Sequence, residues 1–433
     1  MKDFLKLQED STLRAEELLP EAGINKKREI SRLIFEICKR DGLEPKQILS
    51  GEKIKNFEQA KKSLLALRYP LSFSKAPASS YYLPKLDLQA LPDAEIKQEE
   101  FYPKNLFIEK EVLNSPLAKR ALDLFPKAKL TVLEKKTFCG SPNYSKRKEN
   151  LVIIKENFDF IKPCPCTKNC FCCGYNLVNL GFGCAYECSY CFLQQYQNLH
   201  AVVLPANIED FLSKIDGAKL RKGPFPHIRI GSGEFTDSLL FDHITEYSSA
   251  IVKFFKGRPE YFEFKTKSAN IGNLLKLEAL PNIVIGWSVN PQNIISSAEP
   301  LTQPLKNRLA AAAKAARHGY KTAFHFDPVI IHENWRENYL KVIEEIKNTV
   351  PAESIAWISI GTLRFSRELK KCIESRFKDN KILDGEFLLD FDGKMRYPKT
   401  LRKEVYQTLG PALKKAFPQT YVYLCMEEAD LQI

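Results

Sequence analysis

The sequence predicts an α/β fold organised around a partial (β/α)6 barrel of the TIM type, and two observations support this prediction. Between residues 175 and 380, short apolar runs alternate with segments whose apolar residues recur at helical spacing. Alternation of this kind is typical of βα units, which form a parallel sheet with right-handed crossovers. Six such units suit a partial barrel, in which the chemistry lies at the carboxyl ends of the strands.

Each element of the barrel follows from its own run of residues. The expected strands are 176–182, 227–230, 261–265, 283–289, 322–326 and 354–360. The expected helices between them include 208–215, 301–318 and 335–348.

Three further parts flank the barrel, which is assigned to 175–380. Residues 1–100 read as a lysine-rich helical extension with a linker, because helical patterns at 30–38 and 58–67 precede prolines at 70, 77 and 84. Residues 101–174 predict an α+β lead-in with one helix at 115–124 and an auxiliary cysteine cluster. Residues 381–433 predict a hairpin with an Asp392-Gly393 turn and a closing helix.

Two of these parts leave their role open. The helices of 1–100 form either a nucleic-acid-binding helix pair or a small packing or partner-binding module. The hairpin has basic and aromatic residues that suit contact with a phosphate backbone or a base step. The same residues fit an ordinary solvated edge hairpin.

Composition restricts the class of protein. The 433 residues, 44% of them hydrophobic, are enough for a large core, and no run of 18 apolar residues predicts a membrane span. The first residues lack the apolar core of a signal peptide, so we expect a cytoplasmic protein whose twelve cysteines are metal ligands or buried thiols. The net charge of +12 suits a polyanionic partner such as DNA or RNA, although a lysine-rich proteome produces the same charge.

Cys184, Cys188 and Cys191 are the strongest functional signal. Their spacing places three thiolates around one cluster from a single loop, directly after the first barrel strand. A [4Fe-4S] cluster held by three thiolates keeps one iron without a protein ligand, and an open metal position binds a small molecule. The alternatives are a zinc knuckle or scattered buried cysteines.

A second group of cysteines lies just upstream and consists of Cys164, Cys166, Cys170, Cys172 and Cys173. This density predicts an auxiliary site, either a second iron–sulfur cluster or zinc, with Cys139 as a further candidate ligand. Vicinal cysteines rarely both bind one metal, so Cys172 or Cys173 is expected to be spare. The alternative is a set of reactive thiols that are kept reduced.

The stretch Cys188-Ser-Tyr-Cys191-Phe-Leu-Gln194 resembles the cluster loop of the spore photoproduct lyase family, a group of radical S-adenosylmethionine (SAM) enzymes that repair DNA. The likeness runs in the same order from residue 101 to about 425, and the cysteines at 164–173 are not part of that pattern. Its further motifs are Phe101-Tyr-Pro, Leu106-Phe-Ile-Glu109, Phe264-Lys-Thr-Lys267, Ser288-Val-Asn290, Glu299-Pro, Pro304-Leu-Lys-Asn-Arg308 and Pro328-Val-Ile-Ile-His332-Glu-Asn-Trp335.

The resemblance implies a radical SAM barrel in which a reduced [4Fe-4S] cluster cleaves SAM to methionine and a 5′-deoxyadenosyl radical, which abstracts a hydrogen atom from the substrate. In the family that substrate is a methylene-bridged thymine dimer. The resemblance and the basic charge together favour nucleic acid, with DNA repair as the leading function. The chemistry also implies an electron donor such as flavodoxin or ferredoxin.

The resemblance implies roles for individual residues. Lys267 would bind the SAM carboxylate, and Ser288 and Asn290 would meet its ribose or methionine part. Arg308 lies in the family's substrate-side region, and Tyr190 keeps one phenol of a pair thought to relay the hydrogen atom. The structural alternatives are a solvated charge for Lys267 and local hydrogen bonds at a strand end for Ser288 and Asn290.

Two positions depart from the family pattern. Glu234 stands where the family has the cysteine that returns a hydrogen atom, and Phe192 stands where it has the second tyrosine. A carboxylate cannot replace a thiol as hydrogen-atom donor, because its O–H bond is far stronger. Gly233 and Glu234 instead resemble the Gly-Gly-Glu motif by which many radical SAM enzymes hold the SAM amino group through a charge-assisted hydrogen bond.

These departures keep two other functions open. One is radical SAM modification of RNA, a peptide or a small metabolite, with the cysteines at 164–173 serving electron relay or substrate binding. The other is a non-catalytic iron–sulfur protein that binds nucleic acid, against which the residues of the SAM pocket argue.

Overall fold

The computed structural model describes residues 2–70, 91, 94, 99–134, 143–158, 160–167, 170–197, 200–390 and 392–431. The chain divides into two compact units, Met1–Leu88 with Asp384–Glu404 and Gln89–Leu383 with Val405–Ile433, and the division into four parts stays a prediction. The linker predicted around prolines 77 and 84 and the candidate ligand Cys139 lie outside the described residues. Within them, no helix combines the length and the apolar character that a membrane crossing requires.

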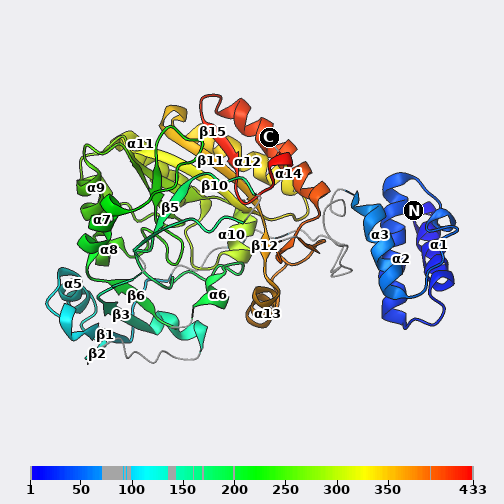
Figure 1. The fold of residues 1–433 in the computed structure, drawn as a ribbon, viewed down its shortest axis with the longest axis horizontal. Helices are drawn as coiled ribbons and strands as arrows, with labels where there is room; N and C mark the ends of the chain where they lie inside the picture. The colour runs from blue at the N-terminus through cyan, green and yellow to red at the C-terminus, as the bar shows by residue number, and fades with distance from the viewer. Residues whose placement is uncertain are drawn as a thin grey trace. The chain divides into compact units, whose positions relative to one another are not determined.

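Among its described residues, the smaller unit has three α-helices, α1 (Lys2–Leu18), α2 (Ile24–Asp41) and α3 (Phe57–Arg68), and α2 packs against the other two (Figure 1). The helices predicted at 30–38 and 58–67 are α2 and α3, whereas α1 was not predicted. Gly42 ends α2 with a φ of 68°, and the Asn56 side chain caps α3 by accepting the Gln59 N–H at 3.0 Å.

The predicted hairpin belongs to the same unit, with β13 (Leu388–Leu389) antiparallel to β14 (Met395–Arg396). Leu388 packs into the core of the three helices, and Glu386 pairs with Arg68 at 2.8 Å. Arg396 is buried and pairs with Asp392 at 2.6 Å. The hairpin is therefore packed and internally neutralised, which corrects both the projecting basic ribbon and the solvated edge hairpin.

The larger unit is built on an eight-stranded sheet curled into a partial barrel, in the order β15-β11-β10-β9-β8-β7-β5-β4. All neighbouring pairs are parallel except β4 with β5. The six predicted strands are β5 (Tyr175–Val178), β7 (Arg229–Gly231), β8 (Tyr261–Thr266), β9 (Ile283–Ser288), β10 (Lys321–Val329) and β11 (Ile355–Thr362). The two edge strands, β4 (Ile161–Pro163) and β15 (Tyr421–Leu424), were not predicted.

The helices predicted in the barrel are α7 (Ile208–Gly217), α11 (Leu305–His318) and α12 (Trp335–Thr349). α11 begins four residues later than predicted, directly after Pro304. The closing helix is α14 (Lys399–Ala416). The remaining short elements are α6 (Leu193–Tyr196), α8 (Asp242–Thr245), α9 (Tyr247–Phe255), α10 (Gln292–Ala298), β12 (Arg364–Phe365) and α13 (Arg367–Arg376).

The lead-in forms a parallel four-stranded sheet of its own in the order β2-β1-β3-β6. Its strands are β1 (Asn105–Glu109), β2 (Lys129–Leu133), β3 (Asn150–Ile154) and β6 (Val202–Pro205), and the predicted helix is α5 (Pro116–Leu124), capped by Ser115. β6 was not predicted. It comes from the chain that follows the first barrel strand, so the two sheets are connected through the cluster loop.

Candidate functional site

The loop with Cys184, Cys188 and Cys191 lies between the carboxyl end of β5 and α6, as expected for a catalytic loop on a parallel sheet. Gly183 opens the loop with a φ of 90°, and a Cβ there would lie 2.4 Å from the carbonyl oxygen of Ala201. Burial raises the pKa of all three thiols, and charge on Cys191 raises the pKa of the other two further. The three cysteines lie on one loop, and the charges of their thiols act on one another.

Arg147, in the short helix Tyr144–Glu149, holds this loop through its backbone. Its fully buried guanidinium donates to the carbonyl oxygens of Cys184 at 2.8 Å and Tyr186 at 2.5 Å. It also forms an ion pair with Glu187 at 2.8 Å. No motif in the sequence pointed to Arg147, because it lies 37 residues before Cys184 on a separate element.

Other side chains fix the middle and the end of the loop. Arg376 of α13 pairs with Glu187 at 2.6 Å, and Asn380 donates to Ser189 Oγ at 3.0 Å. The amide of Gln194 donates to the carbonyl oxygens of Ser189 at 2.8 Å and Cys191 at 3.2 Å. The loop is thus positioned by hydrogen bonds and ion pairs with other parts of the chain.

A buried ion pair lies beside the loop. Glu299 and Arg308 are both fully buried, with carboxylate and guanidinium 2.6 Å apart. Tyr190 donates its phenol hydrogen to the other carboxylate oxygen of Glu299, which also accepts from Asn290 at 2.8 Å. Burial raises the pKa of Tyr190 and the charge of Glu299 raises it further, so the phenol keeps its proton.

Arg308, predicted on the substrate side, has no exposed surface. Besides Glu299, its guanidinium donates to the carbonyl oxygen of Ser288 at 2.9 Å. Ser288 and Asn290 are also buried, and the amide oxygen of Asn290 accepts from Tyr339 at 2.7 Å. In this arrangement Arg308 contacts protein groups that border the site, so direct contact with a substrate stays a prediction.

Lys267 follows β8, and its Nζ lies 5.7 Å from the centre of the Tyr190 ring. Burial lowers the pKa of Lys267, but the charges of Cys188 and Glu299 raise it above its usual value, so the amine is protonated. The carboxylate of Asp237 accepts the backbone N–H of Lys267 at 2.7 Å and fixes its position. Asp237 was not among the predicted site residues, since nothing local in the sequence links it to the end of β8.

Gly233 and Glu234 form the turn after β7. The φ of Gly233 is 98°, and a Cβ there would lie 2.8 Å from the carbonyl oxygen of Lys265, so a side chain does not fit. The carboxylate of Glu234 lies 3.1 Å from the ammonium of Lys162 on β4. The structure therefore brings Tyr190, Lys267 and Arg308 together around Glu299. Glu234 pairs with the ammonium of Lys162, a group of the same kind as the amino group of SAM.

A second charged network lies inside the barrel. Glu263 of β8 is hydrogen-bonded to His325 at 2.6 Å, accepts from the indole of Trp357 at 3.0 Å and lies 3.4 Å from Arg229. Burial alone would raise the pKa of Glu263, but His325 and Arg229 together lower it to about 2. These residues are buried, so the network belongs to the interior of the barrel and does not line its open end.

The auxiliary cysteines follow β4 and precede β5, so they lie at the amino end of the first barrel strand. Cys164, Cys166 and Cys172 are connected by thiol hydrogen bonds, which lower the pKa of Cys166 to about 6. Cys173 packs beside apolar side chains of the barrel floor. The catalytic loop begins at the opposite end of β5.

The residues of the catalytic loop fit a [4Fe-4S] cluster. The three thiols occupy one loop, and the positive charges of Lys267 and Arg147 lie beside them, as an anionic cluster requires. In the part of the chain that the structure describes, no group of three or more His, Cys, Asp or Glu is arranged to hold a metal ion.

Comparison with known proteins agrees with this geometry. The family model for spore photoproduct lyase matches residues 101–425, more than half of the chain. Spore photoproduct lyase of Bacillus subtilis (strain 168) is 26% identical over 304 residues, which cover 67% of this chain and 86% of that protein. The enzyme of Clostridium acetobutylicum is 27% identical over 298 residues, which cover 65% of this chain and 85% of that protein.

Solved structures show the same fold. A mutant of spore photoproduct lyase with bound AdoMet and dinucleoside spore photoproduct has a TM-score of 0.63 and 23% identity, and the match covers 76% of this chain and all of that one. A complex of spore photoproduct lyase with dinucleoside spore photoproduct has a TM-score of 0.63 at 24% identity. The partial radical SAM barrel predicted from the sequence is therefore confirmed, and the chain belongs to the spore photoproduct lyase family.

Proposed function

We propose that this protein is a radical SAM enzyme that cleaves SAM reductively and acts on nucleic acid, with repair of a DNA lesion as its function. The observation that carries the proposal is the loop that presents Cys184, Cys188 and Cys191 at the carboxyl end of β5, beside the protonated Lys267. The relatives are spore photoproduct lyases, and one solved relative binds AdoMet together with dinucleoside spore photoproduct.

When bound, the [4Fe-4S] cluster and SAM supply a radical that abstracts a hydrogen atom from the substrate. The residues of this chain bind and orient both groups. The three cysteines would ligate three irons, and the ammonium of Lys267 would pair with the SAM carboxylate. Glu234 would take the SAM amino group in place of the ammonium of Lys162.

The residues around Glu299 would form the fixed wall of the SAM pocket. Burial raises the pKa of Glu299, but Arg308 and Lys267 lower it below its usual value, so the carboxylate stays ionised. It therefore holds the phenol proton of Tyr190 on one side. Arg308 would be a positioning residue, and Asn290 would keep the carboxylate in place.

Exposed aromatic rings beside the cluster loop support a nucleic-acid substrate. Phe192 is 39% exposed and Tyr196 is 61% exposed, with ring centres 5.9 Å apart. Exposed rings next to a catalytic loop suit stacking with bases, and the net charge of +12 suits a phosphate backbone. A cytoplasmic location and an electron donor such as flavodoxin or ferredoxin complete the proposal.

A second candidate function keeps the SAM chemistry but changes the substrate to RNA, a peptide or a small metabolite. It is favoured by Glu234, because a carboxylate cannot return a hydrogen atom to a product radical. Its pairing with Lys162 supports a binding role for this residue instead.

The test is an anaerobic turnover assay with reconstituted, reduced protein, SAM and an oligonucleotide that contains the spore photoproduct. We expect both 5′-deoxyadenosine and restored thymine. 5′-Deoxyadenosine without restored thymine would move the substrate to the second candidate. Neither product, from protein with a verified iron content, would refute the proposal.

A further inference from the structure

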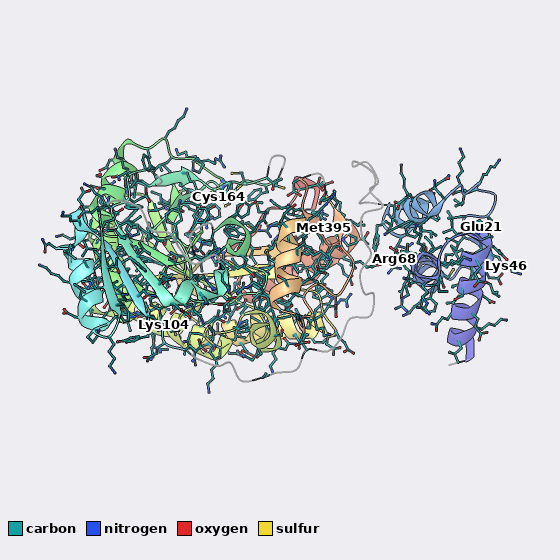
Figure 2. All side chains as sticks on the ribbon, turned by 90° about the horizontal axis from the view of Figure 1, so that it is seen from below. Glu21, Lys46, Arg68, Lys104, Cys164 and Met395 are labelled. Carbon is teal, nitrogen blue, oxygen red and sulfur yellow. The ribbon has the colours of Figure 1, made fainter. Side chains whose placement is uncertain are left out.

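A line of hydrogen bonds runs through the buried side chains of the larger unit, which Figure 2 draws as sticks. It begins at the backbone N–H of Ile330, directly after β10, which donates to the phenol oxygen of Tyr339 in α12 at 2.8 Å. The phenol donates to the amide oxygen of Asn290 at 2.7 Å, and the amide nitrogen of Asn290 donates to Glu299 at 2.8 Å. The line therefore connects α12, which carries no predicted site residue, to the carboxylate beside the cluster loop.

The direction of every bond in this line is fixed by its two ends. A backbone N–H can only donate, so the phenol oxygen of Tyr339 accepts from Ile330 and uses its own hydrogen for Asn290. At the other end, an ionised carboxylate can only accept, so Glu299 takes a hydrogen from the amide nitrogen of Asn290. The amide of Asn290 therefore has one orientation, with its oxygen toward Tyr339 and its nitrogen toward Glu299.

The amide of Asn290 keeps a second N–H for a further partner. Asn290 is 1% exposed, and within the described residues the only acceptor of its amide nitrogen is Glu299. A buried donor hydrogen is expected to meet an acceptor. SAM has such acceptors in its carboxylate and ribose oxygens, and Asn290 lies in the SAM pocket of the function proposed above.

We propose that Tyr339 is a positioning residue, which holds the amide of Asn290 in the orientation that offers a hydrogen-bond donor to SAM. The inference rests on the proposed function, because it requires SAM in this pocket. Without the phenol hydrogen, no donor would hold the amide oxygen in place, so the amide could turn and direct that oxygen toward SAM. An oxygen in this position would repel the SAM oxygens that the N–H group attracts.

The test is SAM binding by Tyr339→Phe, measured by equilibrium dialysis of the full chain with its cluster reconstituted and normalised to the iron content. Phenylalanine keeps the ring, which is fully buried with its centre 6.4 Å from that of Phe326, and removes only the phenol group. We expect the affinity for SAM to fall about tenfold.

The matched control is Tyr320→Phe. Tyr320 is also buried, and its phenol donates to the carbonyl oxygen of Leu274 at 2.9 Å. This variant should lose a similar amount of stability in a denaturant titration and leave the SAM affinity unchanged. Equal SAM affinities of Tyr339→Phe and Tyr320→Phe would overturn the proposal.

A double-mutant cycle with Asn290→Ala shows whether Tyr339 acts through Asn290. Asn290→Ala should weaken SAM binding by itself, and adding Tyr339→Phe should then change the affinity by less than about twofold. If Tyr339→Phe causes the same loss of affinity in both backgrounds, Tyr339 does not act through Asn290 and the proposal is wrong.

The outcomes separate this inference from the function on which it rests. If the wild-type chain with a verified cluster does not bind SAM, the proposed function fails and the inference falls with it. If the wild type binds SAM and Tyr339→Phe binds it equally well, only the inference fails. If Tyr339→Phe does not fold, Asn290→Asp gives the answer, because aspartate keeps the acceptor for Tyr339 and removes the N–H donors. Unchanged SAM affinity in that variant would overturn the proposal.

Discussion

Replacing Arg147 by methionine is expected to loosen the cluster loop while all three cysteines stay in place. The substitution removes the donors to the carbonyl oxygens of Cys184, Tyr186 and Tyr144, at 2.8, 2.5 and 3.2 Å, and one of two ion pairs of Glu187. Each buried carbonyl oxygen left without a donor costs about 1 kcal/mol or more. Glu187 keeps Arg376 as a partner, so its charge is not left alone.

The total cost of Arg147→Met is therefore about 3–5 kcal/mol, concentrated in the loop that carries the cluster. We expect a lower iron and sulfide content after reconstitution and a faster loss of the cluster absorption during dilution. The matched control is Arg258→Met. That arginine is half-buried, pairs with Asp216 at 2.6 Å near the surface and should cost about 1 kcal/mol or less.

The reasoning fails if Arg147→Met and Arg258→Met retain the same iron content and unfold at the same denaturant concentration. In that case the loop would be held in position by its other partners, Arg376, Asn380 and Gln194. Arg147→Lys separates charge from geometry, because lysine keeps the charge but cannot reach several acceptors at once. It should recover only part of the loss.

Three further predictions follow from other parts of the molecule. His325 and Arg229 lower the pKa of Glu263 to about 2 in the folded chain, so the stability that its ionisation contributes is present above its ordinary pKa of 4.5 and is lost as the pH falls toward 2. The unfolding temperature should therefore fall less steeply between about pH 4.5 and about pH 3 in Glu263→Gln than in the wild type, and equal slopes would contradict this. Asn56→Ala removes the cap of α3 and should lower the stability of the smaller unit by about 1 kcal/mol in a denaturant titration, whereas Asn56→Ser should lose much less. Lys267→Met should weaken SAM binding about tenfold or more in equilibrium dialysis when the bound SAM is normalised to the iron content, and unaltered SAM affinity would remove Lys267 from the pocket.

The helices and strands that could be predicted are those whose own residues show an apolar run or a helical repeat. β9 is an almost continuous apolar run, and α11 repeats alanine and leucine at helical spacing up to Gly319. β15 consists of residues that favour strands but is only four residues long, so its signal is weak. It pairs with the distant β11, with Tyr421 opposite Trp357. β4 is three residues long and is defined by its partner in the same way.

The same distinction applies to the site. The cysteine spacing predicted the loop, because three ligands on one short segment are visible in the sequence. Arg147 and Asp237 were missed, since each acts on backbone groups of another element and no residue pattern records such a contact. Phe192 and Glu234 were recognised as departures, but only the structure shows that Lys162 is the partner of Glu234.

The position of β6 decides where this protein can be cut. The chain leaves the barrel sheet at β5, passes through the cluster loop and enters the lead-in sheet at β6, where Val203 also exchanges backbone hydrogen bonds with Phe182. A fragment that starts at Tyr175 would contain every predicted barrel strand, yet it would leave β6 without β3 and expose an unpaired strand edge just behind the cysteines. A minimal active fragment therefore has to begin before Asn105, so that the lead-in strands are synthesised with the barrel they complete.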